Sequence, residues 1–154
     1  MSQLKPSNPK DYIGSTKLPL HLWPLTATAY GSLALLDGEC KYGRSNFRAV
    51  GVRASVYYDA ALRHLGAWFE GEDCDPDSGV HHLGHGLACL AILVEGITAG
   101  NLVDDRNYPT QHRKLVDALT PMVNQIKQRH ADKHPKHYDI QSGAQSGELG
   151  VGSE

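Results

Sequence analysis

The fold is decided by residues 53–95, which read RASVYYDAALRHLGAWFEGEDCDPDSGVHHLGHGLACLAILVE. This segment contains two helical patterns on either side of a short acidic turn. Gly71 breaks the first pattern, and the DPDSG sequence at residues 75–79 is a strong turn signal that also supplies a cap for the second helix. We therefore predict a helical hairpin with a polar corner.

Apolar periodicity defines both helices of this hairpin. In the first, over residues 50–69, apolar residues recur at spacings of three, four and six: Val52, Val56, Leu62, Leu65 and Phe69. In the second, the apolar stripe is formed by Leu83, Leu87, Leu90 and Val94. His82, His85 and Cys89 lie on an adjoining stripe of the second helix.

The corner of the hairpin is unusually rich in titratable groups: Glu72, Asp73, Asp75, His64, His81, His82 and His85. Burying such groups costs several kcal/mol each unless they find partners or a ligand. Two imidazoles one helical turn apart can share a metal ion. A hydrogen-bonded structural network is the alternative, so the corner is a candidate site and not yet an assigned one.

A cationic segment precedes the hairpin. Pro24 suits the first turn of a helix over residues 25–36, and Gly38 weakens or ends that helix. Lys41, Arg44 and Arg48 follow within eight positions, and together with Arg53 they are able to hold several phosphate oxygens. A solvated basic loop is the other interpretation of this segment.

The two ends of the chain differ from its centre. Residues 1–24 contain four prolines and predict an extended arm with enough apolar residues to dock on the body. A last amphipathic helix follows Thr110, with Pro121 kinking or restarting it, and the Gly-, Ser- and Gln-rich residues from about 140 onward predict disorder. We predict an all-α bundle of four to five helices, with an extended arm over 1–24, a nucleotide-binding domain over 25–131 and a flexible tail over 132–154.

Composition excludes several classes of function. The net charge of -2 provides no basic field for a nucleic-acid polymer. Three cysteines without CxxC spacing indicate neither a disulfide framework nor a thiolate zinc site, which fits a reducing cytoplasm. No apolar run approaches the roughly 20 residues of a membrane span, so we expect a soluble protein without a membrane partner. Nucleophile-elbow, P-loop, dinucleotide and zincin motifs are absent from the sequence.

The remaining chemistry rests on carboxylates, imidazoles and cations. Mg²⁺ usually binds through one or two carboxylates together with substrate phosphates. Acids of the turn that hold such an ion, with the cationic segment on a phosphate chain, suit metal-assisted attack of water on a nucleoside polyphosphate.

Several ordered motifs carry a family resemblance: Asn8-Pro9-Lys10-Asp11-x-Ile13-Gly14, Asp37-Gly38-x-x-Lys41-Tyr42-Gly43-Arg44-x-Asn46-Phe47-Arg48, Arg53-Ala54-Ser55, Arg63-His64, Gly71-Glu72-Asp73-x-Asp75-Pro76, His82-Leu83 and Asp104-Asp105-Arg106. Over residues 8–107 the chain resembles small phage-encoded proteins labelled dATP/dGTP diphosphohydrolase. The resemblance implies an all-α protein related to the MazG-type pyrophosphohydrolases, one that cleaves a deoxynucleoside triphosphate with Mg²⁺ or Mn²⁺ in the host cytoplasm.

The sequence departs from the MazG pattern at one point. MazG-type enzymes carry E-x-x-E on one core helix and E-x-x-D on the next. The comparable segments here read Ala61-x-x-His64 and His82-x-x-His85, and the E-x-x-D sequence Glu72-x-x-Asp75 falls in a turn. A metal site is therefore either rebuilt around that turn or absent.

The first hypothesis is a metal-dependent purine nucleoside triphosphate pyrophosphohydrolase that assembles as a homo-oligomer. Its predicted catalytic residues are Glu72, Asp75, His64 and His82. Its predicted metal ligands are Glu72, Asp73, Asp75 and His85. Its predicted nucleotide-binding residues are Lys41, Tyr42, Arg44, Asn46, Arg48, Arg53, Arg63 and Trp68.

The second hypothesis is a protein that binds a nucleotide without hydrolysing it. Without a metal site, a pocket of cations, Tyr, Trp and His would still bind a nucleotide. That is the profile of a phage protein that sequesters a cyclic nucleotide or an ADP-ribose derivative used as a signal in host defence. A third hypothesis treats the histidine corner as a hydrogen-bonded core network with no ligand.

Overall fold

The structure, a computed structural model, describes residues 8–147. The chain divides into one unit that ends at Asp105 and a second that begins at Arg106. Helices dominate the described residues, and the only strands among them are two of two residues each. The predicted all-α class is confirmed. The domain bounds predicted at residues 24 and 131 stay a prediction.

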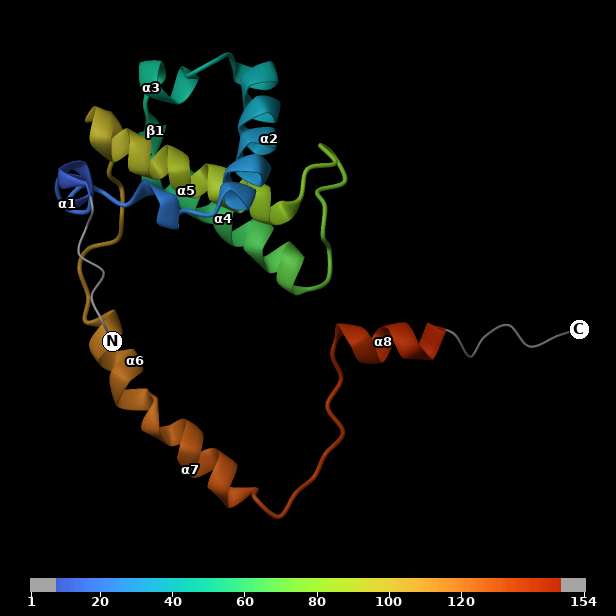
Figure 1. The fold of residues 1–154 in the computed structure, drawn as a ribbon. Helices are drawn as coiled ribbons and strands as arrows, with labels where there is room; N and C mark the ends of the chain where they lie inside the picture. The colour runs from blue at the N-terminus through green and yellow to red at the C-terminus, as the bar shows by residue number, and fades with distance from the viewer. Residues whose placement is uncertain (1–7, 148–154) are drawn as a thin grey trace, which may run out of the picture. The chain divides into compact units, whose positions relative to one another are not determined.

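Three long helices form the body of the first unit: α2 (Leu25–Tyr42), α4 (Ala54–Phe69) and α5 (His82–Ala99) (Figure 1). Helix α5 lies between the other two and contacts both along its length. In the described part of the chain, α5 alone is long and apolar enough to cross a membrane by length and composition.

Small residues make the contacts between these helices. The buried positions of α2, α4 and α5 include Gly31, Ala34, Ala54, Ala61, Gly84, Gly86, Ala88 and Gly96. A Cβ atom at Gly84 would lie 2.7 Å from the backbone oxygen of Tyr30, so α2 and α5 approach one another almost backbone to backbone. Among the described residues no large side chain is fully buried.

The start of α4 is held by residues that follow α5. Strands β1 (Val52–Arg53) and β2 (Leu102–Val103) pair in parallel, and the short helix α3 (Asn46–Val50) precedes β1. The Asp105 carboxylate accepts hydrogen bonds from the backbone N–H of Ser55 at 2.9 Å and from its hydroxyl at 2.6 Å. Asp105 thereby caps the N-terminus of α4, where negative charge is favourable.

The turn between α4 and α5 forms the predicted corner. Gly71, at φ 103°, ends α4, and Cys74 and His81 then form an isolated antiparallel bridge. The backbone N–H of His82 donates to the carbonyl of Asp73 at 2.9 Å, which returns the chain toward α5. The predicted helical hairpin is present.

The N-terminal segment is more helical than an extended arm. It contains α1 (Pro9–Gly14) and the 3₁₀ turn η1 (Leu20–Leu22). Pro9 occupies the first turn, where its missing N–H costs nothing, and the Asn8 side chain accepts from the backbone N–H of Lys10. Sequence reasoning counted prolines as breakers and overlooked this start signal.

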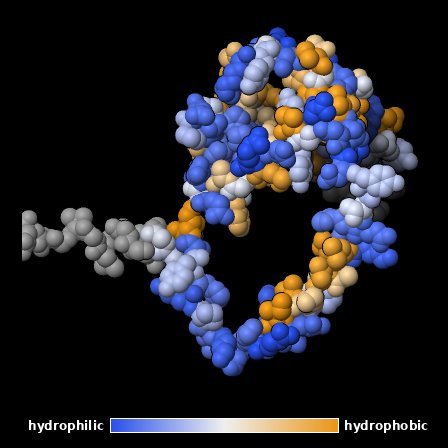
Figure 2. Space-filling model, turned by 180° about the vertical axis from the view of Figure 1, so that it is seen from behind, coloured by the Kyte–Doolittle hydropathy of each residue, from blue (hydrophilic) through white to orange (hydrophobic). Residues whose placement is uncertain are grey.

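The second unit consists of α6 (His112–Leu119), α7 (Pro121–Arg129) and α8 (Ile140–Gly147). Pro121 restarts the helix, as one of the two predicted outcomes had it. Apolar side chains gather along one side of α6 and α7 (Figure 2). Helix α8 occupies residues for which disorder was predicted; Asp139 caps it by accepting from the Ser142 N–H at 2.9 Å. The remainder of the predicted tail, 148–154, lies outside the described residues.

Candidate active site

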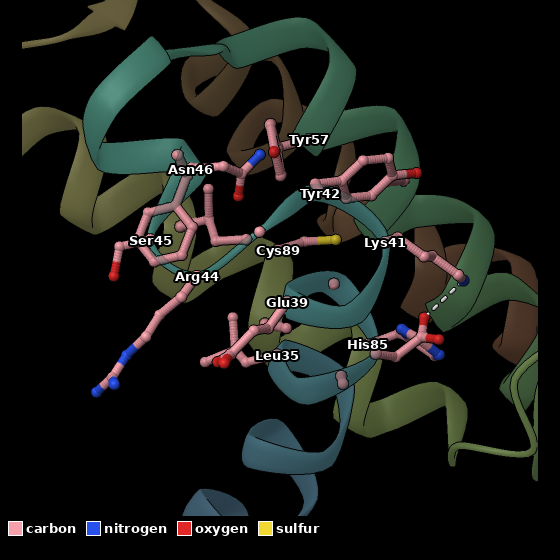
Figure 3. Close-up of a pocket in the computed structure, with 18 of the residues that line it drawn as sticks. Leu35, Glu39, Lys41, Tyr42, Arg44, Ser45, Asn46, Tyr57, His85 and Cys89 are labelled. Atoms are coloured by element: carbon pink, nitrogen blue, oxygen red, sulfur yellow. Dashed lines mark hydrogen bonds and ion pairs between the residues drawn. The ribbon is translucent and has the colours of Figure 1, made fainter.

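A pocket of about 440 Å³ opens between α2, α4 and α5 (Figure 3). The second half of α2, the loop at residues 43–45 and the start of α3 form one side of it. The side chains that give it chemical character are Asp37, Glu39, Lys41, Tyr42, Arg44, Asn46, Tyr57, His64, Asp75, His85 and Cys89. Its volume falls within the range of roughly 300–1,000 Å³ that is usual for small-molecule sites.

Two cations lie at the wall of this pocket. Lys41 Nζ contacts Asp37 Oδ2 at 2.7 Å, and this hydrogen bond raises the pKa of Lys41 above its ordinary value, so the ammonium stays charged. Arg44 makes no ion pair or side-chain hydrogen bond with any described residue. Its guanidinium extends from the loop at the opposite side of the pocket from Lys41 (Figure 3).

A hydrogen-bonded chain joins Asp75, Ser78 and His85. The Ser78 hydroxyl donates to Asp75 Oδ2 at 3.0 Å, and His85 Nε2 lies 2.8 Å from the same hydroxyl oxygen. A hydroxyl has one proton. Since Asp75 accepts it, Nε2 of His85 is the donor to Ser78, and in the neutral form of the ring Nδ1 is then the unprotonated nitrogen. That nitrogen has no hydrogen-bond partner among residues 8–147.

A second chain joins Glu72, His82 and His64. The Nδ1 atoms of His64 and His82 are 2.9 Å apart, so one ring donates to the other. His82 is only 5% exposed, and its Nε2 makes no hydrogen bond within the described residues. Glu72 Oε2 lies 3.7 Å from that nitrogen. The carboxylate favours a proton on Nε2 of His82, which makes His64 Nδ1 the donor of the shared hydrogen bond.

The two chains meet where the rings of His64 and His85 stack. Their centroids are 4.5 Å apart and their planes differ by 12°. Burial, together with the neighbouring imidazoles, lowers the pKa of His64, so its ring is neutral at pH 7. Burial alone would raise the pKa of Asp75, but hydrogen bonds from the Asp77 N–H and the Ser78 hydroxyl outweigh it and lower the pKa, so Asp75 is ionised.

The inner wall of the pocket is apolar. Leu35, Ala88 and Ile92 line it beside Tyr57 and Cys89. Burial raises the pKa of Tyr57 and that of the Cys89 thiol, so both groups are neutral at pH 7. A neutral, buried thiol is a poor nucleophile, and Cys89 serves as a small apolar surface here.

The structure brings together part of the predicted site. Seven predicted residues line the pocket: Lys41, Tyr42, Arg44, Asn46, His64, Asp75 and His85. The predicted residues outside its lining are Arg48, Arg53, Arg63, Trp68, Glu72, Asp73 and His82. Arg48 instead pairs with Glu95 at 2.6 Å, and Arg53 contacts Asp105 at 3.4 Å. Glu72 and His82 reach the pocket only through His64.

Sequence reasoning did not name several residues of this site as catalytic, nucleotide-binding or metal-binding, chiefly Asp37, Glu39, Tyr57 and Ser78. Two of them carried a usable signal. Asp37 lies four positions before Lys41, the spacing of a helical ion pair. Tyr57 precedes His64 by seven positions and therefore shares its face of the helix. The bond between Ser78 and His85 depends on the path of the turn, which the sequence alone does not specify.

The donor set at the pocket suits an ion that arrives with a ligand. Among residues 8–147, no group of three or more His, Cys, Asp or Glu side chains is arranged to hold a metal ion. Three carboxylates, those of Asp37, Glu39 and Asp75, nevertheless line the pocket. Mg²⁺ commonly takes one or two carboxylates and completes its shell with water and substrate phosphates, which is a set that this pocket is able to supply.

The segment of the chain that matches a known protein family contains the whole pocket. The family described as "dATP/dGTP diphosphohydrolase, N-terminal" matches residues 7–106, which is more than half of the chain. The chain belongs to this family. All the residues that line the pocket fall inside the matched range.

A comparison with a single named relative gives a similar result. A protein of Salmonella phage PMBT28 named "dATP/dGTP diphosphohydrolase" is 30% identical to this chain over 92 residues. The match takes in 60% of this chain and 31% of the relative, so the chain matches less than a third of that protein's length. No solved structure matches the chain.

Proposed function

We propose that the pocket binds dATP or dGTP and hydrolyses it to the monophosphate and pyrophosphate. One observation carries this proposal. Two cations, an ionised carboxylate and an imidazole of defined tautomer line one pocket, and that pocket lies within the segment matched by the family. The name of the phage relative supplies the substrate class.

The cations account for triphosphate binding. Arg44, which has no partner among the described residues, is able to form a bidentate contact with phosphate oxygens, and Lys41 adds a point charge. Tyr42 and Asn46 supply a hydroxyl and an amide at the same wall. The apolar inner wall, with Tyr57 and Ile92, suits the flat face of a purine.

His85 is the proposed general base. Its unprotonated Nδ1 accepts a proton from water as the water oxygen attacks the α-phosphorus. The bond from the α-phosphorus to the oxygen that bridges it to the β-phosphorus breaks, and pyrophosphate leaves with that oxygen. Asp75, 3.5 Å from His85 Nε2, stabilises the imidazolium that forms, and Ser78 holds the ring in place.

Mg²⁺ or Mn²⁺ is the proposed cofactor. Asp75 would hold it, with Asp37 or Glu39 as a second carboxylate from the pocket wall. When bound, such an ion neutralises phosphate charge and makes the phosphorus more electrophilic. The chain's own residues bind the triphosphate and accept the proton.

A direct assay of pyrophosphate release tests the proposal. Wild-type protein is incubated with dGTP or dATP and Mg²⁺ or Mn²⁺, and products are identified by ³¹P NMR. We expect deoxynucleoside monophosphate and pyrophosphate, with activity lost in Lys41→Met and Asp75→Asn. Arg113→Met, at an exposed position in α6, is the matched control and should retain activity. No pyrophosphate from wild-type protein with either metal would refute the proposal.

The same samples separate hydrolysis from simple storage of a nucleotide. If the pocket only sequesters a signal, denatured protein releases an intact nucleotide, and tight binding persists in EDTA. The similarity to the phage relative does not favour this alternative, since that relative is named as a hydrolase. It gains support only if binding is found without turnover.

A further inference from the structure

Helix α5 presents an apolar stripe on the side opposite to the pocket. His85, Ala88, Cys89 and Ile92 face the pocket. At 100° per residue, a second stripe lies about half a turn away from them. Its first two residues, Leu83 and Leu87, are half-buried and line a smaller pocket beside α2. The rest of the stripe consists of Leu90, Val94 and Ile97. Leu90, Val94 and Ile97 are more than half exposed.

Helix α4 continues this surface. Tyr58, Leu62, Leu65 and Phe69 recur at the same helical spacing, and each is between 40% and 80% exposed. They lie away from the α4 side chains that line the pocket, Tyr57, Ala60 and His64. A Cβ atom at Gly86 of α5 would lie 3.7 Å from Leu65 Cδ2, which places the α4 stripe beside α5. We call the two stripes together the apolar face.

The apolar face is larger than the exposed apolar patches that monomeric proteins usually have. Its seven most exposed side chains are each 40–80% exposed. At roughly 150–200 Å² for a whole large apolar side chain, they offer an area on the order of 700 Å². The largest apolar patch of a typical monomer is about 300–600 Å². A standard protein interface takes roughly 800 Å² from each partner. The face therefore matches what one subunit contributes to a stable dimer.

Charge and shape favour a second copy of the same chain as the partner. No acidic or basic residue belongs to either stripe, and the single charged residue of α5, Glu95, pairs instead with Arg48. An uncharged face is complementary to itself, as a two-fold interface requires. It is two helices wide, so two helices from a partner cover it and complete a four-helix bundle.

We propose that the chain forms a homodimer in which the apolar faces of α4 and α5 pack against each other about a two-fold axis. Because the face lies on the opposite side of α5 from the pocket, both pockets stay open in the dimer. This proposal does not rest on the proposed reaction. It is tested by molecular mass and by thermal stability, neither of which depends on catalysis.

The test compares molecular mass in wild-type protein and two variants by light scattering after size exclusion. Wild-type protein should show twice the 16.8 kDa of the chain. Leu90→Glu places two unpaired carboxylates in the interface and should weaken association by at least about 100-fold. Val50→Glu adds the same charge at an exposed apolar residue outside the face and should leave the dimer intact.

A mutation-free measurement accompanies the variants. The Tm of wild-type protein should rise with protein concentration, because association stabilises only the folded state. Circular dichroism checks that Leu90→Glu keeps its helical content. A monomeric wild-type protein with a concentration-independent Tm would overturn the proposal, and so would a mass that Leu90→Glu leaves unchanged.

Discussion

The two sides of α5 are built from different residues and have different partners. On the pocket side, His85 belongs to a chain of hydrogen bonds with Ser78 and Asp75. On the other side, Leu90 and Val94 belong to a broad apolar surface that the described chain leaves more than half exposed. A leucine stripe at helical spacing usually marks the buried side of a helix. In this protein it marks the outer side.

Small residues between the helices explain this reversal. The buried positions of α5 are His82, Gly84, Gly86, Ala88, Cys89 and Gly96, none of them a large aliphatic residue. Their size lets α2 and α4 approach α5 closely. Leu87 then lies beside Gly31 of α2, whereas Leu90 and Val94 are left on the outside. The close approach also sets the width of the pocket, because α2 and α4 both contribute to its wall.

The largest expected effect is on the pocket side. His85→Gln removes the proposed base and should lower kcat for dGTP hydrolysis by about 1,000-fold. Ala91→Ser changes an exposed residue of the same helix outside the pocket lining and should leave kcat unchanged. Steady-state kinetics at saturating dGTP measures both. Equal activity of His85→Gln and wild-type protein would remove His85 from the mechanism.

The contact between the helices gives the next largest effect. Gly84→Ala places a Cβ atom 2.7 Å from the Tyr30 carbonyl oxygen, where only a backbone shift relieves the clash. We expect a loss of about 3 kcal/mol in the free energy of unfolding. Gly66→Ala, in the same kind of helix with nothing within 4 Å, should gain up to about 1 kcal/mol. Urea titration of the two variants measures the difference, and equal stabilities would contradict close packing.

A smaller effect is expected at Ser78, whose hydroxyl contacts His85 on the pocket side of α5. Ser78→Ala removes the hydroxyl that fixes the His85 tautomer and should lower kcat by about 10-fold. Ser78→Thr retains a hydroxyl and should restore most of the activity. A purely structural role would change the Tm of Ser78→Ala without changing the pH profile of kcat, so that profile is the deciding measurement.

The smallest effect concerns the cap of α4. Hydrogen bonds from the Ser55 hydroxyl and N–H lower the pKa of Asp105 below its ordinary value of 3.8. In the window between the folded and unfolded pKa the unfolded state binds more protons, so this stabilisation is present above pH 3.8 and is lost as the pH falls through the lower folded pKa. Asp105→Asn should have a lower Tm than wild-type protein at pH 7. This difference in Tm should become smaller at acid pH, where wild-type protein also loses the charge of Asp105. An unchanged difference across that range would contradict the cap.

Local patterns predicted the hairpin and its polar corner, and half of the predicted site residues line the pocket. Apolar periodicity identified α4 and α5, and the acids and histidines between them identified the corner that contains Asp75 and His85. The cationic segment contributed Lys41 and Arg44 because charge density is visible in the sequence.

Contacts between distant residues were beyond this reasoning. Asp105 caps α4 across 50 positions, and Arg48 pairs with Glu95. Neither partner can be chosen from local spacing, so these arginines and acids looked equally suited to a ligand. The outward direction of the leucine stripe was also hidden, because periodicity specifies which residues share a face and not which face is covered.

Methyl NMR with a non-hydrolysable dGTP analogue and Mg²⁺ tests the account most directly, because it resolves the two sides of one helix. The account predicts shifts at the pocket methyl groups of Ala88 and Ile92, and none at Leu90 and Val94. Shifts confined to Leu90 and Val94, or no shifts at all, would contradict it.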